Sequence, residues 1–115
     1  MAKFKVEKPS LIEDGRHQGV ITDVTLREKP FSYADVHIKL DDTEIVLKAS
    51  YPANVTENTK FGQLLIRFGA KLIPDTEIEA NEVLVGKKCQ FVTISEQTER
   101  GTFAHVVQDS VKMSG

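Results

Sequence analysis

Aromatic and basic side chains follow one another closely along the stretch from Arg27 to Tyr51. Flat rings on which bases stack, and cations that pair with phosphates, are the two groups that sequence-tolerant binding of a single nucleic-acid strand requires. Stacking alone contributes roughly 1–3 kcal/mol per base. Ten residues of these two kinds are therefore candidates for nucleic-acid binding: Arg27, Lys29, Phe31, Tyr33, His37, Lys39, Lys48, Tyr51, Lys88 and Arg100.

No group of residues in the sequence has the types and spacing of a catalytic site. The three histidines lack metal-ligand spacing and Cys89 has no neighbouring ligand, so we expect no metal. Asp23 and Asp35 stand apart, whereas metal-dependent nuclease or phosphatase chemistry needs clustered carboxylates. There is also no phosphate-cradling glycine-rich loop and no Ser/His/Asp signature. We therefore expect no enzyme activity, no catalytic residue and no cofactor.

The charge balance excludes a binder that depends on bulk positive charge. The chain has 15 Lys and Arg against 17 Asp and Glu, a formal net charge of −2, whereas such binders are strongly basic. Four carboxylates lie close together in sequence: Asp75, Glu77, Glu79 and Glu82. Without them, the rest of the chain carries a net positive charge. An acidic patch and a separate basic groove are compatible with binding that falls steeply with salt.

Length and composition indicate one globular domain. The chain has 115 residues, of which 40% are hydrophobic, enough for a single core. One cysteine excludes an internal disulfide framework, and no apolar stretch approaches the roughly 20 residues that span a bilayer. The polar start shows no secretory signal, so we expect a reducing, cytoplasmic location. We expect residues 1–14 to be an extension and residues 15–115 to form the domain.

Alternating polarity predicts three strands that would position the candidate residues. The first runs over 15–28 with Gly19 as a bend or bulge, Val20 and Val24 on one face, and Ile21 and Asp23 on the other. Residues 33–40 and 43–50 form a hairpin that turns at 41–42. Its predicted inward residues are Ala34, Val36, Ile38, Leu40, Ile45, Leu47 and Ala49, which leaves Tyr33, His37, Lys39 and Lys48 outward.

The second half of the chain predicts one helix and two further strands. Phe61, Leu64, Leu65 and Phe68 form one apolar stripe of a helix over 59–68, capped by Asn58 or Thr59 and ended by Gly69. Gly62 costs this helix about 1 kcal/mol relative to alanine. A helical turn at 82–85 precedes a strand over 87–96 with Cys89, Phe91 and Thr93 on one face. A hairpin loop at 97–101 leads to a last strand over 102–112.

Five curved strands with one helix between the third and fourth resemble the OB-fold over residues 15–112. The resemblance implies a mainly β, five-stranded, partly open Greek-key barrel; another small barrel, such as an SH3-like one, is the alternative. OB-folds bind oligonucleotides or oligosaccharides on the face of strands 2 and 3, rimmed by the loops called L12 and L45. These loops correspond here to residues 29–32 and 97–101.

Three segments are similar to those of small single-stranded-DNA-binding OB proteins of phages, archaea and archaeal viruses. They are Glu13–Ile21, Leu64–Gly69 and Leu84–Cys89. The resemblance implies non-catalytic binding of single-stranded DNA in replication, recombination or repair, with RNA left open as a ligand. Bacterial single-strand binders usually end in an acidic tail that recruits partners. This chain ends in Val111–Gly115, so that role is not carried over.

A protein-interaction or assembly module without a nucleic-acid role is the alternative function. Exposed edge strands invite pairing with another chain. Val46 and Val92 lie on otherwise polar faces and are candidate contacts, and the acidic cluster could meet a basic partner. A homodimer, or a complex with replication or repair proteins, fits either function, and we expect no membrane partner.

Overall fold

Strands account for most of the regular structure in the part of the chain that the computed structural model describes, residues 2–4, 12–29 and 31–114. Residues 1 and 5–11 of the expected extension lie outside this part. Ile12 is buried in the core, so the folded unit begins before residue 15. The elements are β1 (Gly15–Arg27), β2 (Tyr33–Leu40), β3 (Val46–Pro52), α1 (Lys60–Arg67), α2 (Ala80–Leu84), β4 (Lys88–Thr98), β5 (Gly101–Val106), the 3₁₀ turn η1 (Gln108–Ser110) and β6 (Lys112–Met113).

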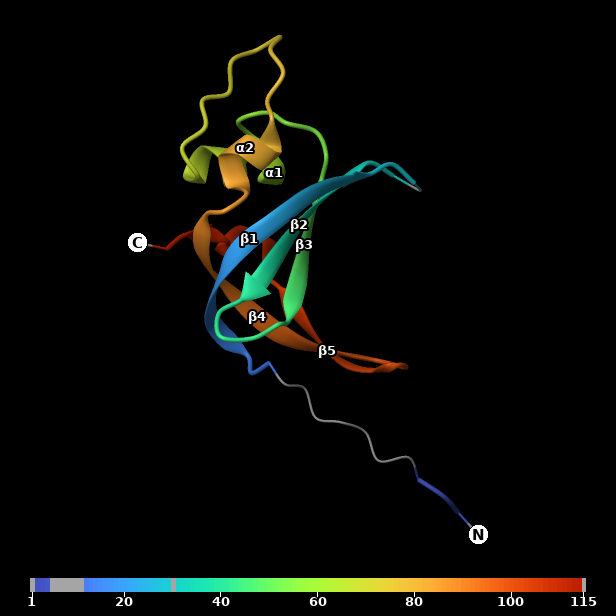
Figure 1. Cartoon of the computed structure of the whole chain (residues 1–115). Helices are drawn as coiled ribbons and strands as arrows, with labels where there is room; N and C mark the ends of the chain where they lie inside the picture. The colour runs from blue at the N-terminus through green and yellow to red at the C-terminus, as the bar shows by residue number, and fades with distance from the viewer. Residues whose placement is uncertain (1, 5–11, 30, 115) are drawn as a thin grey trace.

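All the strands pair antiparallel in one sheet. The order is β3-β2-β1-β4-β5, and the short β6 pairs with β4. Figure 1 shows the two helices gathered at one end of this sheet. Among the described residues no ladder joins β3 to β5, so the sheet is open and no closed barrel forms. The strand content confirms the predicted mainly β class. None of the described helices has the length and apolarity needed to cross a membrane.

The predicted apolar face of the β2–β3 hairpin forms the centre of the core. Ala34, Val36, Ile38 and Ala49 are buried there, as predicted. The same holds for β4, whose inward side chains are Cys89, Phe91 and Thr93. Helix α1 closes the core with the predicted stripe of Phe61, Leu64, Leu65 and Phe68, all of them buried. A helix of only eight residues is marginal on its own, so α1 is stabilised by burying this apolar stripe against the core.

The start of α1 is built around a close approach that only glycine permits. Thr59 caps the helix, and its hydroxyl accepts a hydrogen bond from the Gly62 amide at 3.1 Å. A Cβ on Gly62 would lie 1.7 Å from the carbonyl oxygen of Thr56. The predicted propensity cost of this glycine is therefore offset by the packing that it allows.

A bulge in β1 reverses which residues point inward, and it does not lie at Gly19, where the sequence predicted a bend or bulge. The register shifts between Ile21 and Asp23, so the bulge lies at Thr22 rather than Gly19. Ile21 and Val24 consequently share the inward face, which corrects the predicted opposition of these two residues. Gly19 instead serves a close approach, because a Cβ there would lie 2.5 Å from the Lys39 carbonyl oxygen.

The C-terminal strand predicted over 102–112 is wrong as a single element. β5 ends at Val106, η1 turns the chain, and β6 returns it to pair with β4 at Cys89 and Gln90. Ser110 fixes this turn: its hydroxyl accepts from the Val92 amide at 2.8 Å and donates to the Val107 carbonyl at 2.6 Å. The β4–β5 ladder extends to the pair Thr98 and Gly101, so the predicted five-residue loop is shorter.

Candidate nucleic-acid interface

The register of the sheet brings cations from four strands onto one surface, which we call the outer face. Lys39 of β2 pairs with Val46 of β3 on one side and with Val20 of β1 on the other. Val20 in turn pairs with Lys88 of β4. Directly paired residues point to the same side of a sheet, and the apolar residues between them point into the core. The sequence-predicted residues on the outer face are Arg27, Tyr33, His37, Lys39, Lys48 and Lys88.

Arg27 and Tyr33 are in direct contact on the outer face. The guanidinium carbon lies 5.0 Å from the centroid of the Tyr33 ring, within the range of a cation–π contact. Its Nε lies 3.3 Å from Oδ2 of Asp35, and Ser50 donates to Oδ1 of the same carboxylate at 2.7 Å. Arg27 is therefore partly neutralised, and its main role is to hold the Tyr33 ring in place.

Asp35 is the buried polar group on which this arrangement depends. Its exposed fraction is only 5%, although it alternates with the inward residues of β2 and lies on the opposite side of the strand. Burial by itself would raise the pKa of Asp35. The hydrogen bond from Ser50 and the positive charges of Arg27 and Lys48 outweigh this effect, so the pKa of Asp35 lies below its ordinary value.

Lys39, Lys48 and Lys88 are the cations of the outer face selected from the sequence that have no ion pair among the described residues. Lys48 stands directly opposite His37, whose Nε2 lies 3.1 Å from the hydroxyl of Thr25. Strands in a sheet lie about 4.8 Å apart, so Lys39 and Lys88, two strands apart, are separated by about 10 Å. We call these three lysines the line of cations; they lie on the outer face of β3, β2 and β4, with Val20 of β1 between Lys39 and Lys88.

Lys29, Phe31 and Arg100 lie at the tips of two hairpins instead of on the sheet. Lys29 and Phe31 belong to the β1–β2 connection, and Arg100 belongs to the β4–β5 turn. Both hairpins project from the side of the molecule opposite the C-terminus (Figure 1). The ring of Phe31 is 70% exposed, and Phe103 of β5, which sequence reasoning did not select, is 53% exposed.

Tyr51 does not belong to this surface, which corrects its selection as a stacking residue. It pairs with Ala34, points inward and has no exposed area. Its hydroxyl donates to the Gln108 carbonyl at 2.8 Å, and its ring packs against Phe61. Burial raises the pKa of Tyr51 above its ordinary value, so the phenol stays neutral. A ring enclosed in this way offers no face to a base.

Sequence reasoning also missed outward residues of β1 and the C-terminal segment. Arg16 and Gln18 of β1 pair with Val92 and Gln90 of β4, and Gln90 pairs with Lys112 of β6. The alternation around Gln90 was visible in the sequence. The register that aligns β1, β4 and β6 was not, and it alone shows that Arg16 and Lys112 flank the same strand.

The described residues contain no cluster typical of a metal site, and Cys89 is buried. Among them no three His, Cys, Asp or Glu side chains gather in a way that could hold a metal ion. Burial, reinforced by the charge of Asp41, raises the pKa of the Cys89 thiol to about 12. A neutral, enclosed thiol is a poor nucleophile.

Comparison with known proteins adds no family to this geometry. No protein-family model matches the chain, and no curated protein sequence matches it.

Proposed function

We propose that this chain binds single-stranded DNA without catalysis, through the outer face of β2 and β3 together with the two hairpin tips. Such a protein would protect or present the strand during replication, recombination or repair. The observation that carries the proposal is the line of cations formed by Lys48, Lys39 and Lys88. A local field of this kind steers a polyanion even where the net charge of the protein is negative.

Two rings, the half-buried Tyr33 and the exposed Phe31, favour a single strand over a duplex as the ligand. Tyr33 is held by Arg27 on the outer face, and Phe31 extends from the adjoining hairpin tip. A base can stack on such a ring only when its own face is not covered by base stacking within a duplex. Rings beside cations therefore fit unpaired bases attached to a phosphate backbone.

An OB-like arrangement is part of the proposal. The strand order and the position of the helices between β3 and β4 agree with it. Side chains connect β3 to η1, the turn that follows the other edge strand: Tyr51 donates to the Gln108 carbonyl, and the Gln108 side chain donates to the Ser50 carbonyl. These two hydrogen bonds between side chains and backbone support the OB-like arrangement, in which the two edges of the sheet lie near each other.

Fluorescence anisotropy with labelled oligonucleotides tests the proposal. Titrations use single- and double-stranded DNA and single-stranded RNA at two salt concentrations. We expect tighter binding of the single strand and weaker binding at higher salt. Tyr33→Ala combined with Lys48→Ala should weaken binding at least tenfold, while Lys71→Gln, which removes an exposed charge outside the outer face, should leave it unchanged.

Two results would remove the proposal. One is no binding of single-stranded DNA by the wild-type chain at low salt. The other is equal affinity of the wild-type chain and the double variant, provided that circular dichroism shows both to be folded. Tighter binding of RNA than of DNA would retain the surface and change the ligand.

Exposed apolar side chains on the two hairpins support protein assembly as a second candidate function. Leu26 and Phe31 are exposed at the β1–β2 hairpin, and Ile94 and Phe103 at the β4–β5 hairpin. Exposed apolar patches of this kind mark interaction surfaces. Light scattering after size exclusion distinguishes the two candidates, since a stable homodimer with no affinity for DNA favours assembly.

A further inference from the structure

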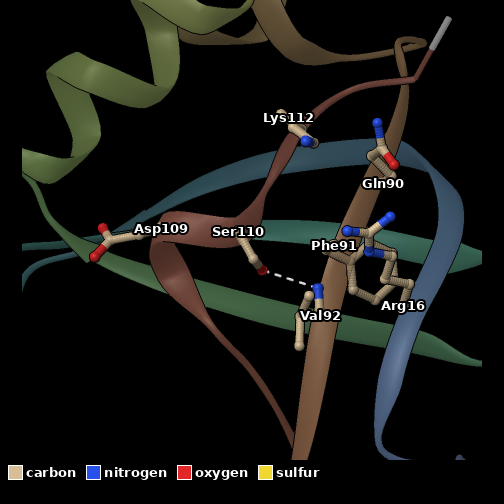
Figure 2. Close-up of a pocket in the computed structure, with 7 residues that line it drawn as sticks. All are labelled: Arg16, Gln90, Phe91, Val92, Asp109, Ser110 and Lys112. Carbon is tan, nitrogen blue, oxygen red and sulfur yellow. Dashed lines mark hydrogen bonds between the residues drawn. The ribbon is translucent and has the colours of Figure 1, made fainter.

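A small pocket on the outer side of β4 contains donors that the proposed site does not use. Its walls come from β1, β4 and the segment from η1 to β6 (Figure 2), and its volume is about 160 Å³. The residues that line it are Arg16, Gln90, Phe91, Val92, Asp109, Ser110 and Lys112. A cavity needs only about 10–15 Å³ to hold one water molecule, so a phosphate group fits.

Three of these side chains carry hydrogen-bond donors without a partner. Within residues 2–4, 12–29 and 31–114, no side-chain hydrogen bond or ion pair involves Arg16, Gln90 or Lys112. A guanidinium presents a planar fork of N–H groups, an ammonium presents a point charge, and an amide adds two further donors. Together they match the oxygens of a phosphate, which accepts such charge-assisted bonds readily.

The remaining polar side chains of the pocket do not compete for this role. The Ser110 hydroxyl already bonds the Val92 amide and the Val107 carbonyl. Figure 2 shows the Asp109 carboxylate pointing away from Arg16 and Gln90. The side of the pocket near Gln90 is therefore positive, with Arg16 on one flank and Lys112 on the other.

The pocket continues the line of cations on the outer face. Lys88 is the last member of that line, and Gln90 is the next outward residue of the same strand. Successive outward residues of a strand lie about 7 Å apart. A bound strand that crosses Lys39 and Lys88 would thus reach the pocket with its following phosphates.

We propose that Arg16, Gln90 and Lys112 bind one phosphate group, and that this phosphate belongs to a nucleic-acid strand that extends beyond the outer face. The second part of this inference rests on the proposed function. The first part is a property of the pocket alone and is tested separately.

Two variants and a matched control test the contribution to strand binding. Arg16→Gln and Lys112→Gln each remove one charge from the pocket, and Lys71→Gln removes one exposed charge elsewhere. With a single-stranded oligothymidylate at about 50 mM salt, each pocket variant should raise the Kd by roughly 3- to 10-fold. The control should change it less than twofold. Equal effects of all three variants would overturn the strand-binding part.

Titration of inorganic phosphate into ¹⁵N-labelled wild-type chain tests the pocket itself. We expect saturable shifts of the Gln90 side-chain amide and the Val92 backbone amide, and their loss in Arg16→Gln. Shifts that are absent, or that persist in Arg16→Gln, would overturn phosphate binding in the pocket even if the chain binds DNA. Phosphate binding together with no binding of any oligonucleotide would overturn the proposed function and retain the pocket as a site for a free phosphate.

Discussion

Asp35 places a negative charge beside a surface that we propose for an anion, and its value is structural. The carboxylate holds Arg27 against Tyr33 and accepts a hydrogen bond from Ser50. Because the carboxylate is paired with Arg27 and accepts a hydrogen bond from Ser50, it repels a bound phosphate less than an unpaired carboxylate would, and its main effect is to orient its neighbours. Replacing Asp35 should therefore lower both the stability of the fold and the affinity for the strand, because the Tyr33 ring would lose its support.

Replacing Asp35 should change how stability depends on pH. Its pKa is lowered in the folded chain, so the carboxylate stabilises the fold above its ordinary pKa of about 4, and this contribution is lost as the pH falls through the folded pKa. Asp35→Asn should cost about 1–3 kcal/mol at pH 7. In urea unfolding the difference from wild type should shrink at pH 3. A difference that stays constant with pH would contradict the charge-based explanation.

Cys89 should react only when the chain unfolds. Burial and the nearby charge of Asp41 raise its thiol pKa to about 12, and the side chain has no exposed area. Almost no thiolate exists at pH 8, so a disulfide reagent such as Ellman's should modify the native chain slowly and the urea-unfolded chain within the mixing time. Rapid modification of the native chain would show that this part of the core opens readily.

At the scale of elements, helix α1 provides the sharpest test of packing against propensity. Gly62→Ala adds a residue that favours the helix by about 1 kcal/mol, but its Cβ would lie 1.7 Å from the Thr56 carbonyl oxygen. We expect the clash to dominate, with a net loss of about 1–3 kcal/mol in the free energy of unfolding. Lys60→Ala, an exposed change in the same helix that removes one hydrogen bond to the Gln108 side chain, should alter it by less than about 1 kcal/mol. A stabilised Gly62→Ala variant would contradict the close approach.

The sequence predicted those elements whose signal is local. Strict alternation in β2 and the i, i+3, i+4, i+7 stripe in α1 each depend on one segment, and both predictions were confirmed. The bulge at Thr22 was missed because it exists only in the pairing of β1 with β2. The break after Val106 was missed because Val107 and Val111 continue an apolar pattern across a turn fixed by Ser110.

The candidate site was predicted in part for the same reason. Tyr33, Lys39 and Lys48 were selected from their own strands and do share the outer face. Tyr51 was misplaced because Pro52 suggested that the strand had already ended, although Leu47, Ala49 and Tyr51 continue one inward alternation. Arg16 and Lys112 come from segments nearly one hundred residues apart, and only their shared neighbour strand β4 brings them together.

At the scale of the whole molecule, Tyr51 links β3 to η1 near the place where, within the described ranges, no ladder joins β3 to β5. Its hydroxyl and the side chain of Gln108 are the hydrogen-bonded connections between β3 and η1 in the described chain. Tyr51→Phe keeps the ring and removes one bond, which should cost about 1–2 kcal/mol. Hydrogen exchange should quicken at the amides of Val107 and Ser110 more than in β1 and β2. Uniform quickening would indicate global destabilisation instead.

The distribution of charge over the whole molecule leads to a prediction about salt. The formal net charge is −2, so a description based on net charge alone predicts no attraction for DNA. The outer face instead presents Lys39, Lys48 and Lys88 in one line. For a single strand, each phosphate that is neutralised contributes about −0.7 to the slope of log K against log salt. We expect a slope of about −2 for these three contacts, and a steeper one if the pocket at Arg16 also takes a phosphate.

Charge-removing variants separate this local description from the net-charge one. Lys39→Gln should weaken binding and reduce the steepness of the slope by about 0.7, because one phosphate contact is lost. Lys71→Gln changes the net charge by the same amount and should leave the slope unchanged, since Lys71 lies outside the outer face. Equal slopes for both variants would mean that the net charge of the protein governs binding and that Lys39 makes no specific phosphate contact. A slope that is less steep for Lys39→Gln alone would place the strand on the outer face at Lys39, and the wild-type slope divided by about −0.7 would give the number of phosphates contacted.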